Sequence, residues 1–278
     1  MAEKTIVYLT DSQLDPWLAD RCRELLLEAA NGIPIVSVSQ QPLDFGLNVC
    51  VGDIGRSGPS LETQIFEGLK RVETRWVAIA EHDCIYSKQY FEWTPPDDEN
   101  FWYNDNAWLC QLHNPAHPHM DGMFSFMRGR RAQSQLICNT ENFLKASGEK
   151  LGILTDPAWI GRYPKRYIGE PGNANPSKAM RLSKFRNMRG VRKKIKNYLT
   201  VYHAKDWRSD IPNIDIRHGH NFTGPRRGNK RSHTLEPWGT LYDVLGRPPV
   251  VSGSNDKRTE NADNAPQGQR NEAMADIH

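Results

Sequence analysis

A mostly apolar run that ends in charged residues is the part of this sequence best suited to chemistry. The run Trp76-Val-Ala-Ile-Ala is followed directly by Glu81, His82 and Asp83. Such a run predicts a strand buried on both faces, with the acids at its carboxyl end. In open α/β sheets, ligands bind at that edge, and carboxylates there can hold a divalent cation that in turn holds a diphosphate. The alternative is that the acids merely meet solvent at the end of a strand.

The elements before this strand should bring other polar residues to the same edge. Residues 5–10 predict a strand that ends at Asp11, a helix follows from Asp15-Pro16 to Asn31-Gly32, and residues 33–39 predict a second strand. A strand, a crossover helix and a second strand predict a parallel, right-handed unit. A second helix, with Leu61, Ile65, Phe66, Leu69 and Val72 on one face, then leads into the acidic strand.

The ends of these three strands predict a nucleotide-sized crevice. Thr10, Asp11, Gln40 and Asp83 all follow strands of one parallel sheet and should converge at its carboxyl edge. The loop from Gly55 to Ser60 adds Arg56 and small residues before a helix N-terminus, which is suited to cradling a phosphate. A simple turn is the alternative for this loop.

The middle of the chain is less regular. Residues 86–103 are rich in aromatic residues and proline, which suits either a loop packed over the sheet or a wall that stacks on a base or sugar ring. Residues 104–112 and 123–127 predict strands, and Asn139-Thr140-Glu141 begins another helix. Prolines interrupt His113, His117 and His119, so a loop with incidental histidines is favoured over a metal cluster. Glu170, beside Pro171 and Gly172, is either a positioned base or a turn acid.

The last third of the chain contains a strongly basic stretch. Ten Lys and Arg residues and no acid lie between Pro171 and Lys205, which indicates a surface for a polyanion or a flexible basic insertion without a ligand. Residues 212–218 predict a last short strand, after which His218 and His220 could complete a metal site. Residues 251–278 have almost no large apolar side chain and predict a disordered polar tail.

The overall composition predicts one α/β domain over residues 1–250. The net charge of +3 is nearly balanced, so the local basic excess matters more than the total. The five cysteines are widely spaced, which predicts free thiols in a reducing compartment. The sequence has neither a signal-peptide pattern nor an apolar run long enough to span a membrane, and a cytoplasmic location is expected.

Four motifs together resemble a GT-A-type nucleotide-sugar glycosyltransferase, most like the branch found in bacteriophages and bacteria. They are Thr-Asp-Ser at 10–12, Arg-Ser-x-x-Ser at 56–60, Ala-Glu-His-Asp-Cys-Ile-Tyr at 80–86 and Asp-Ile-Arg-His-Gly-His-Asn at 215–221. The resemblance implies a GT-A-like (Rossmann-like), mostly parallel central sheet flanked by helices, with a basic C-terminal helical segment at 178–205. Residues 1–112 would form the nucleotide-sugar-binding half, and residues 113–250 the acceptor-binding half.

The resemblance also implies roles for individual residues. Asp83 matches the second aspartate of an Asp-x-Asp motif that binds Mn²⁺ or Mg²⁺ and the donor diphosphate, and Glu81 stands in the place of the first. His218 or His220 would add a metal ligand. Glu170, or else Glu141, would be the base of an inverting enzyme, whereas a retaining enzyme needs none. The donor, most simply a UDP-sugar, would contact Thr10, Asp11, Ser12, Arg56, Ser57, Glu81 and Asp83.

These expectations combine into a metal-dependent hexosyl- or pentosyltransferase. The basic segment suits a DNA acceptor, namely a hydroxymethylated pyrimidine in phage DNA, with Arg189, Arg192, Lys193 and Lys194 on the phosphates and the host cytoplasm as location. Two alternatives remain open: a glycosyltransferase of cell-surface glycan synthesis, and a nucleic-acid-binding protein without catalysis. Salt-sensitive DNA binding and donor hydrolysis discriminate among the three.

Overall fold

The central sheet of the protein is mostly parallel, as the sequence predicted. The computed structural model describes residues 3–112, 118–126, 128–161, 168–172, 189–219, 221 and 230–246. Seven strands form the sheet in the order β10-β6-β9-β4-β1-β2-β3, and only β9 runs antiparallel to its neighbours. The strands are β1 (Lys4–Leu9), β2 (Ile35–Ser39), β3 (Leu47–Cys50), β4 (Trp76–Glu81), β6 (Asn100–Asn104), β9 (Leu136–Asn139) and β10 (His203–Trp207).

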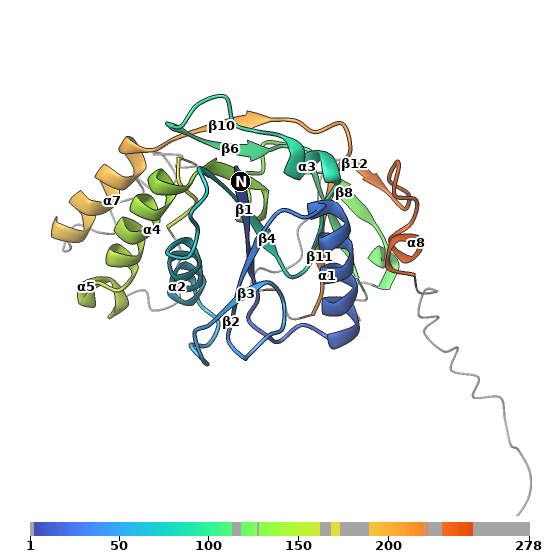
Figure 1. Ribbon diagram of the computed structural model, residues 1–278, viewed down its shortest axis with the longest axis horizontal. Coiled ribbons are helices and arrows are strands. Elements are labelled where there is room, and N and C mark those ends of the chain that lie inside the picture. Colours follow the sequence, from blue (N-terminus) through green and yellow to red (C-terminus); the bar gives the residue numbers. More distant parts are fainter. Residues whose placement is uncertain are drawn as a thin grey trace, which may run out of the picture.

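Helices cover one face of this sheet, and the other face is shared by helices and a second sheet (Figure 1). Helices α2 (Gly58–Leu69), α4 (Thr140–Leu154) and α7 (Arg189–Val201) lie on the first face, with the short α5 (Pro157–Ile160) beside them. Helices α1 (Pro16–Ala30) and α3 (Lys88–Glu92) lie on the second face. The alternation of β1 explains both layers, because Val7 and Leu9 point toward α2 while Ile6 and Tyr8 point toward α1.

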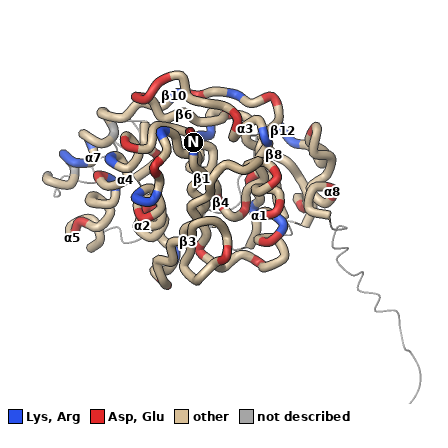
Figure 2. Tube along the Cα trace, viewed as in Figure 1, with Lys and Arg blue, Asp and Glu red and all other residues tan. Residues whose placement is uncertain are grey.

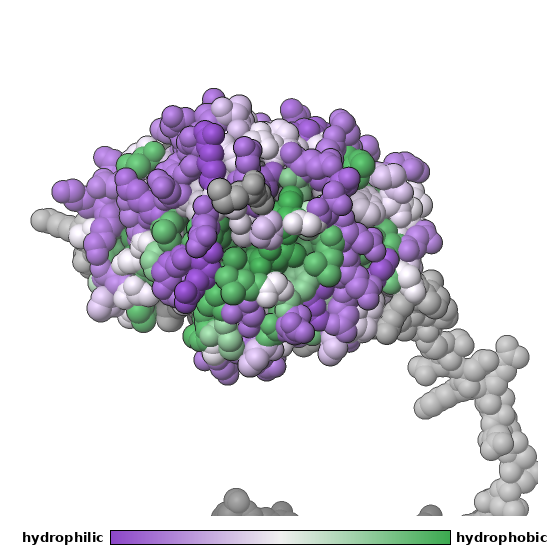
Figure 3. All heavy atoms as spheres, viewed as in Figure 1, coloured by the Kyte–Doolittle hydropathy of each residue, from purple (hydrophilic) through white to green (hydrophobic). Residues whose placement is uncertain are grey.

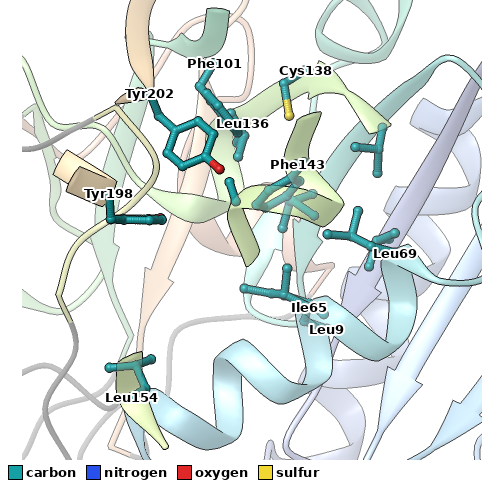
Figure 4. Packing of buried hydrophobic residues seen from close by; sticks show 14 of the residues in the cluster. Leu9, Ile65, Leu69, Phe101, Leu136, Cys138, Phe143, Leu154, Tyr198 and Tyr202 are labelled. Carbon is teal, nitrogen blue, oxygen red and sulfur yellow. The ribbon is translucent and has the colours of Figure 1, made fainter. Parts of the chain in front are cut away.

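Aromatic and aliphatic side chains fill the first face (Figure 4). Phe101 of β6 packs edge-on against Phe143 of α4 and against Tyr202, with ring centroids 5.9 and 5.5 Å apart. Ile65 and Leu69 of α2 close the same cluster. These contacts hold α2, α4 and α7 together as one layer against the sheet.

A second, five-stranded sheet was not predicted. Its order is β12-β8-β7-β11-β5. Apolar side chains of this sheet, including Ile214 and Ile216, pack against α1 and against the short helix α8 (Leu241–Leu245). Its strands are β5 (Cys84–Ile85), β7 (Ala107–Gln111), β8 (Phe124–Phe126), β11 (Asn213–Arg217) and β12 (Lys230–Ser232), with the 3₁₀ turns Pro118–Met120 and Gln133–Gln135 nearby in the chain.

One expectation for the middle of the chain is confirmed and one needs correction. The strand expected over 104–112 is β7, which begins at Ala107, because the buried Asn104 at the end of β6 accepts from the backbone N–H of Asn106 (3.0 Å) and turns the chain. The aromatic segment 86–103 is not simply a loop, since it contains α3 and most of β6. Its aromatic side chains pack against other parts of the protein: Trp93 stacks on Trp207 of β10, with ring centroids 4.1 Å apart.

The edge strand β3 carries an apolar surface. Leu47 is 58% exposed, and Ile54 in the loop after β3 is also exposed. Figure 3 shows an apolar area in the middle of the face on which β2 and β3 are labelled in Figure 1. All five cysteines are free, as expected. Among the described residues, no helix combines the length and apolar character that crossing a membrane requires.

A buried ion pair joins α2 and α4. Lys150 Nζ lies 2.7 Å from Glu62 Oε2, with both side chains at most 1% exposed, and Ser147 Oγ donates to Glu62 Oε1 (2.6 Å). We expect Lys150→Met to lower the free energy of unfolding by about 3–5 kcal/mol, because it leaves Glu62 as an uncompensated buried charge. Urea denaturation would measure the loss.

The matched control for this prediction removes both charges. The double variant Glu62→Leu/Lys150→Met should regain most of the stability that Lys150→Met loses, since apolar replacements of a buried pair are often neutral. A Lys150→Met protein within about 1 kcal/mol of wild type, on the scale of ordinary single substitutions, would contradict the expectation.

Candidate functional site

The carboxyl ends of β1, β2 and β4 meet as the sequence predicted. The backbone N–H of Thr10 donates to Val38 O (3.0 Å), and that of His82 donates to Leu9 O (3.1 Å). The Gln40 side chain ties the end of β2 to the following loop, with Nε2 2.8 Å from Gly55 O. The ends of β1, β2 and β4 and the loop before α2 therefore lie together at the carboxyl edge of the sheet.

The predicted donor residues at this edge divide into two groups. Asp11 and Arg56 form an ion pair, with Oδ2 and Nε 2.5 Å apart. Ser57 caps α2 by accepting from Ser60 N (3.1 Å), and Ser12 Oγ accepts from Gln41 N (3.2 Å). The two serines thus hold loops in place, while Asp11 and Arg56 offer the charged groups.

Asp83 lies between two imidazoles that come from different sheets. It sits in the turn between β4 and β5, next to His82, and His218 follows β11. One ligand atom from each of these three residues lies within 4.8 Å of the other two, and His218 Nε2 is 3.4 Å from Asp83 Oδ2. Asn221 Nδ2 also donates to Asp83 Oδ2 (2.8 Å). The loop after β11 therefore completes a cluster around Asp83.

His82 is oriented by the residues that follow β1. Its Nδ1 lies 2.9 Å from Thr10 Oγ1 and 3.6 Å from Asp11 Oδ1. Burial lowers the pKa of His82, so the ring is neutral at neutral pH. With the proton on Nδ1, as this network favours, Nε2 has the lone pair that a metal ligand needs, an arrangement that many metal-binding histidines share.

These residues fit a divalent cation by the chemistry of their donor atoms. One carboxylate and two imidazoles suit Mn²⁺, Fe²⁺, Co²⁺ or Zn²⁺ better than Mg²⁺, which prefers oxygen ligands. Cys84 lies within the same distance of Glu81 and Asp83, but burial raises the pKa of its thiol well above the usual range, so it stays protonated. His220, His113 and His117 lie outside the described residues, and His119 is exposed in the turn Pro118–Met120.

Burial and neighbouring charges separate the pKa values of the two acids. Burial alone would raise the pKa of Asp83, but His218, His82 and Arg217 outweigh it and hold that pKa well below its usual range. Burial, together with the charges of Asp83 and Asp215, raises the pKa of Glu81 well above its usual range. Asp83 is therefore the carboxylate that remains ionised to meet a cation.

Three charged residues near this cluster were missed by sequence reasoning. Asp215 and Arg217 alternate with apolar residues along β11, a pattern that normally places them in solvent, yet both are buried. Arg130 Nη2 contacts Asp215 Oδ2, and Arg217 Nη1 lies 3.4 Å from Asp215 Oδ1. The polar face of β11 is thus turned inward, which the alternation by itself does not reveal.

The two candidate bases lie at opposite edges of the sheet. Tyr103 Oη donates to Pro171 O (2.8 Å), which anchors the Glu170 loop near the carboxyl end of β6, and the charge of Glu170 contributes to the raised pKa of Glu81. Glu141 instead begins α4 after β9, whose last residue pairs with Trp76 at the amino end of β4. With six residues in β4 at about 3.3 Å each, Glu141 is roughly 20 Å from Asp83.

The described part of the basic segment is the amphipathic helix α7 followed by the start of β10, so the segment is not helical throughout. Val191, Ile195 and Tyr198 of α7 are buried in the core, while Lys193 and Lys194 are exposed. Lys194 Nζ pairs with Asp156 Oδ2 (3.0 Å), so an acid from outside the segment balances one of its charges. Figure 2 shows basic residues along α7, at the end of the molecule away from α1 and α8. The side chains of Arg189 and Arg192 lie outside the described residues, as do residues 173–188.

Comparisons with known proteins find weak similarity in structure and none in sequence. The sequence matches no protein-family model and no curated protein. A glycosyltransferase involved in glycosylation of the major capsid of PBCV-1 shares 9% identity over 73% of this chain and 81% of its own, with a TM-score of 0.38. A Drosophila β1,4-galactosyltransferase 7 variant in complex with manganese, UDP-Gal and xylobiose shares 12% over 52% of each chain, with a TM-score of 0.31.

A third solved structure is similar to this chain to the same low degree. The bifunctional IspDF of Campylobacter jejuni shares 13% identity over 61% of this chain and 50% of its own, with a TM-score of 0.35. Because these three TM-scores are all below 0.5, they assign neither a family nor an activity to this chain.

Proposed function

We propose that this protein transfers a sugar from a nucleoside diphosphate sugar to an acceptor hydroxyl, with a divalent cation held by His82, Asp83 and His218. The observation that carries the proposal is the cluster of these three residues beside the Asp11–Arg56 pair. It lies at the carboxyl edge of parallel strands, where α/β sheets bind nucleotides. When bound, the cation would neutralise charge on the leaving diphosphate.

The other steps of the proposed reaction depend on side chains of the protein itself. Arg56 would hold the diphosphate, with its guanidinium kept in place by Asp11. The acceptor oxygen attacks the anomeric carbon, and the bond from that carbon to the diphosphate breaks with its electrons leaving on the diphosphate. Glu170, at the same edge as Asp83, would accept the acceptor's proton. Glu141 takes no part in this proposal, because β9 delivers it to the other edge.

For the acceptor, we propose DNA with a hydroxymethylated pyrimidine, which would place the protein in a host cytoplasm. Support comes from the exposed lysines of α7 and the basic residues before it. Mass spectrometry of nucleosides tests this directly, after hydroxymethylated DNA is incubated with the protein, Mn²⁺ and a panel of UDP-sugars. The expected product is a hydroxymethyl nucleoside heavier by one sugar.

The same experiment separates the alternatives. Donor hydrolysis without a modified nucleoside would favour a different acceptor, such as a cell-surface glycan. DNA binding without any donor turnover would favour a nucleic-acid-binding protein and end the enzymatic proposal.

The contribution of the basic segment can be measured by substitution. Replacing Arg189, Arg192, Lys193 and Lys194 with alanine should raise the KM for DNA and flatten its salt dependence, because phosphate contacts release counterions. The donor KM should stay within about twofold, since these residues belong to α7 and not to the strand ends that form the proposed donor site. A matched control replaces Lys70 and Lys88, exposed lysines beside α2 and in α3. Unchanged kinetics in the fourfold variant would remove this segment from acceptor binding.

A further inference from the structure

Arg130 and Asp215 form a buried ion pair next to the candidate metal ligands. Asp215 is 2% exposed and pairs across strands with Cys84, the residue after Asp83. The backbone N–H of Ile216 also donates to Asp83 O (2.8 Å). Strand β11 therefore fixes the ion pair beside Asp83, although the pair belongs neither to the metal cluster nor to the donor contacts proposed above.

The guanidinium of Arg130 has a donor atom that Asp215 does not use. Its Nη2 contacts Asp215, whereas its Nη1 is buried and has no hydrogen-bond partner within the described part of the chain. A guanidinium offers five N–H donors, and a buried donor on a charged group is costly to leave unpaired. Such an atom is suited to receive a polar ligand.

The position of Arg130 decides which part of a donor it would meet. The guanidinium of the neighbouring Arg131 lies 6.0 Å from the ring of Tyr103 in β6, whose Oη donates to Pro171 O beside Glu170, so this part of the chain lies on the β6 side of the sheet. Asp11 and Arg56 lie beyond the end of β1, and β1 and β6 are on opposite sides of β4, the strand that leads to Asp83. In a direct displacement, the transferred sugar must lie between the leaving diphosphate and the base that takes the acceptor's proton. Arg130 thus borders the sugar and not the diphosphate.

The surrounding charges decide the chemical class of that sugar. Asp215 neutralises Arg130, and Asp83 and Glu170 are further acids at this edge of the sheet. The carboxylate of a uronic acid would be repelled by these groups. A hydroxyl group can accept from Nη1 and donate to a neighbouring carboxylate at the same time.

We propose that Arg130, positioned by Asp215, hydrogen-bonds a hydroxyl of the transferred sugar and selects donors with a neutral sugar. This inference rests on the proposed function and adds its sugar specificity. Arg217 supports the pair from the other oxygen of Asp215. Arg130 therefore contributes to recognition of the sugar, whereas Arg56 and the cation contribute to recognition of the diphosphate.

Calorimetric titration of the full-length protein in Mn²⁺ tests the proposal. The ligands are UDP, UDP-glucose, UDP-galactose, UDP-N-acetylglucosamine and UDP-glucuronate. Wild type should bind at least one neutral UDP-sugar more tightly than UDP-glucuronate. In Arg130→Met, the Kd for UDP should stay within about twofold, while the Kd for that UDP-sugar should rise about tenfold, as expected for one lost hydrogen bond to a charged group.

Arg131→Met is the matched control. Arg131 is the neighbouring residue, and its guanidinium instead pairs with Asp206 on β10, at 2.6 and 2.8 Å. This variant should bind both ligands as wild type does. Should Arg130→Met fail to fold, Arg130→Lys retains the charge beside Asp215 but lacks the planar fork, and should raise the Kd of the UDP-sugar alone.

Four outcomes would overturn the inference in distinguishable ways. Equal loss of UDP and UDP-sugar in Arg130→Met would assign Arg130 to the diphosphate, and unchanged affinity for both would remove it from the site. Tightest wild-type binding to UDP-glucuronate would contradict the selection of neutral sugars. A wild-type protein that binds no nucleotide would instead reject the proposed function, and the sugar subsite with it.

Discussion

Asp83→Asn should abolish sugar transfer and weaken Mn²⁺ binding by more than about 100-fold, since even the loss of a residue that merely supports a metal ligand costs about 10- to 100-fold. Asp83 is the only carboxylate in the cluster with His82 and His218. Its pKa is held well below the usual range, so its negative charge is present at neutral pH. The asparagine variant retains the shape of the side chain but not this charge.

Titration with Mn²⁺, followed by electron paramagnetic resonance, measures the effect directly. Wild type should also bind Mn²⁺ more tightly than Mg²⁺, because imidazole ligands favour transition metals. Asp20→Asn is the control: Asp20 is an exposed acid of α1 that contacts Arg23. If Asp83→Asn binds Mn²⁺ as wild type does, the cation does not bind at this cluster.

Glu170→Gln should reduce transfer by about 100- to 10,000-fold, which is the contribution typical of a general base. Glutamine has nearly the same shape as glutamate but cannot accept the acceptor's proton. Donor affinity should stay within about twofold, because the Glu170 loop is anchored to β6, on the opposite side of β4 from β1 and the Asp11–Arg56 pair. The measurement is kcat for transfer, together with the Kd for UDP.

The control for this prediction is Glu141→Gln, which should leave transfer unchanged. Glu141 is exposed in the first turn of α4, at the opposite edge of the sheet. Transfer by Glu170→Gln at nearly the wild-type rate would mean that another group takes the proton, or that the enzyme retains anomeric configuration and needs no such base.

Local sequence predicted the elements that lead to Asp83. The apolar run before Glu81 became β4, and α1 begins after Asp15, its predicted N-cap. These features depend on backbone conformation and on neighbours within one turn, so short stretches of sequence contain the information. The parallel order of β1, β2 and β4 followed from the crossover helices between them.

The tertiary structure decided the direction of β9 and the close approach of α2 to the central sheet. Nothing in residues 136–139 indicates that β9 runs antiparallel to β4, and that direction places Glu141 at the wrong edge. Gly68 gives a second case: a Cβ there would lie 2.7 Å from a methyl of Val38, so α2 approaches the sheet closely only because this residue is glycine. In the sequence, Gly68 is simply a helical residue with low helix propensity.

The sequence by itself determined where the carboxylates of Glu81 and Asp83 lie and which strand delivers them, because hydrophobic period and capping are local. Only the tertiary structure decided which charges surround those carboxylates. The alternation in β11 is the same whether Asp215 faces water or a partner, and its burial depends on Arg130, which is 85 residues away in the chain. Likewise, His82 gained its orientation from Thr10, a contact across 72 residues. Contacts of this range exist only once both sheets have packed around α1.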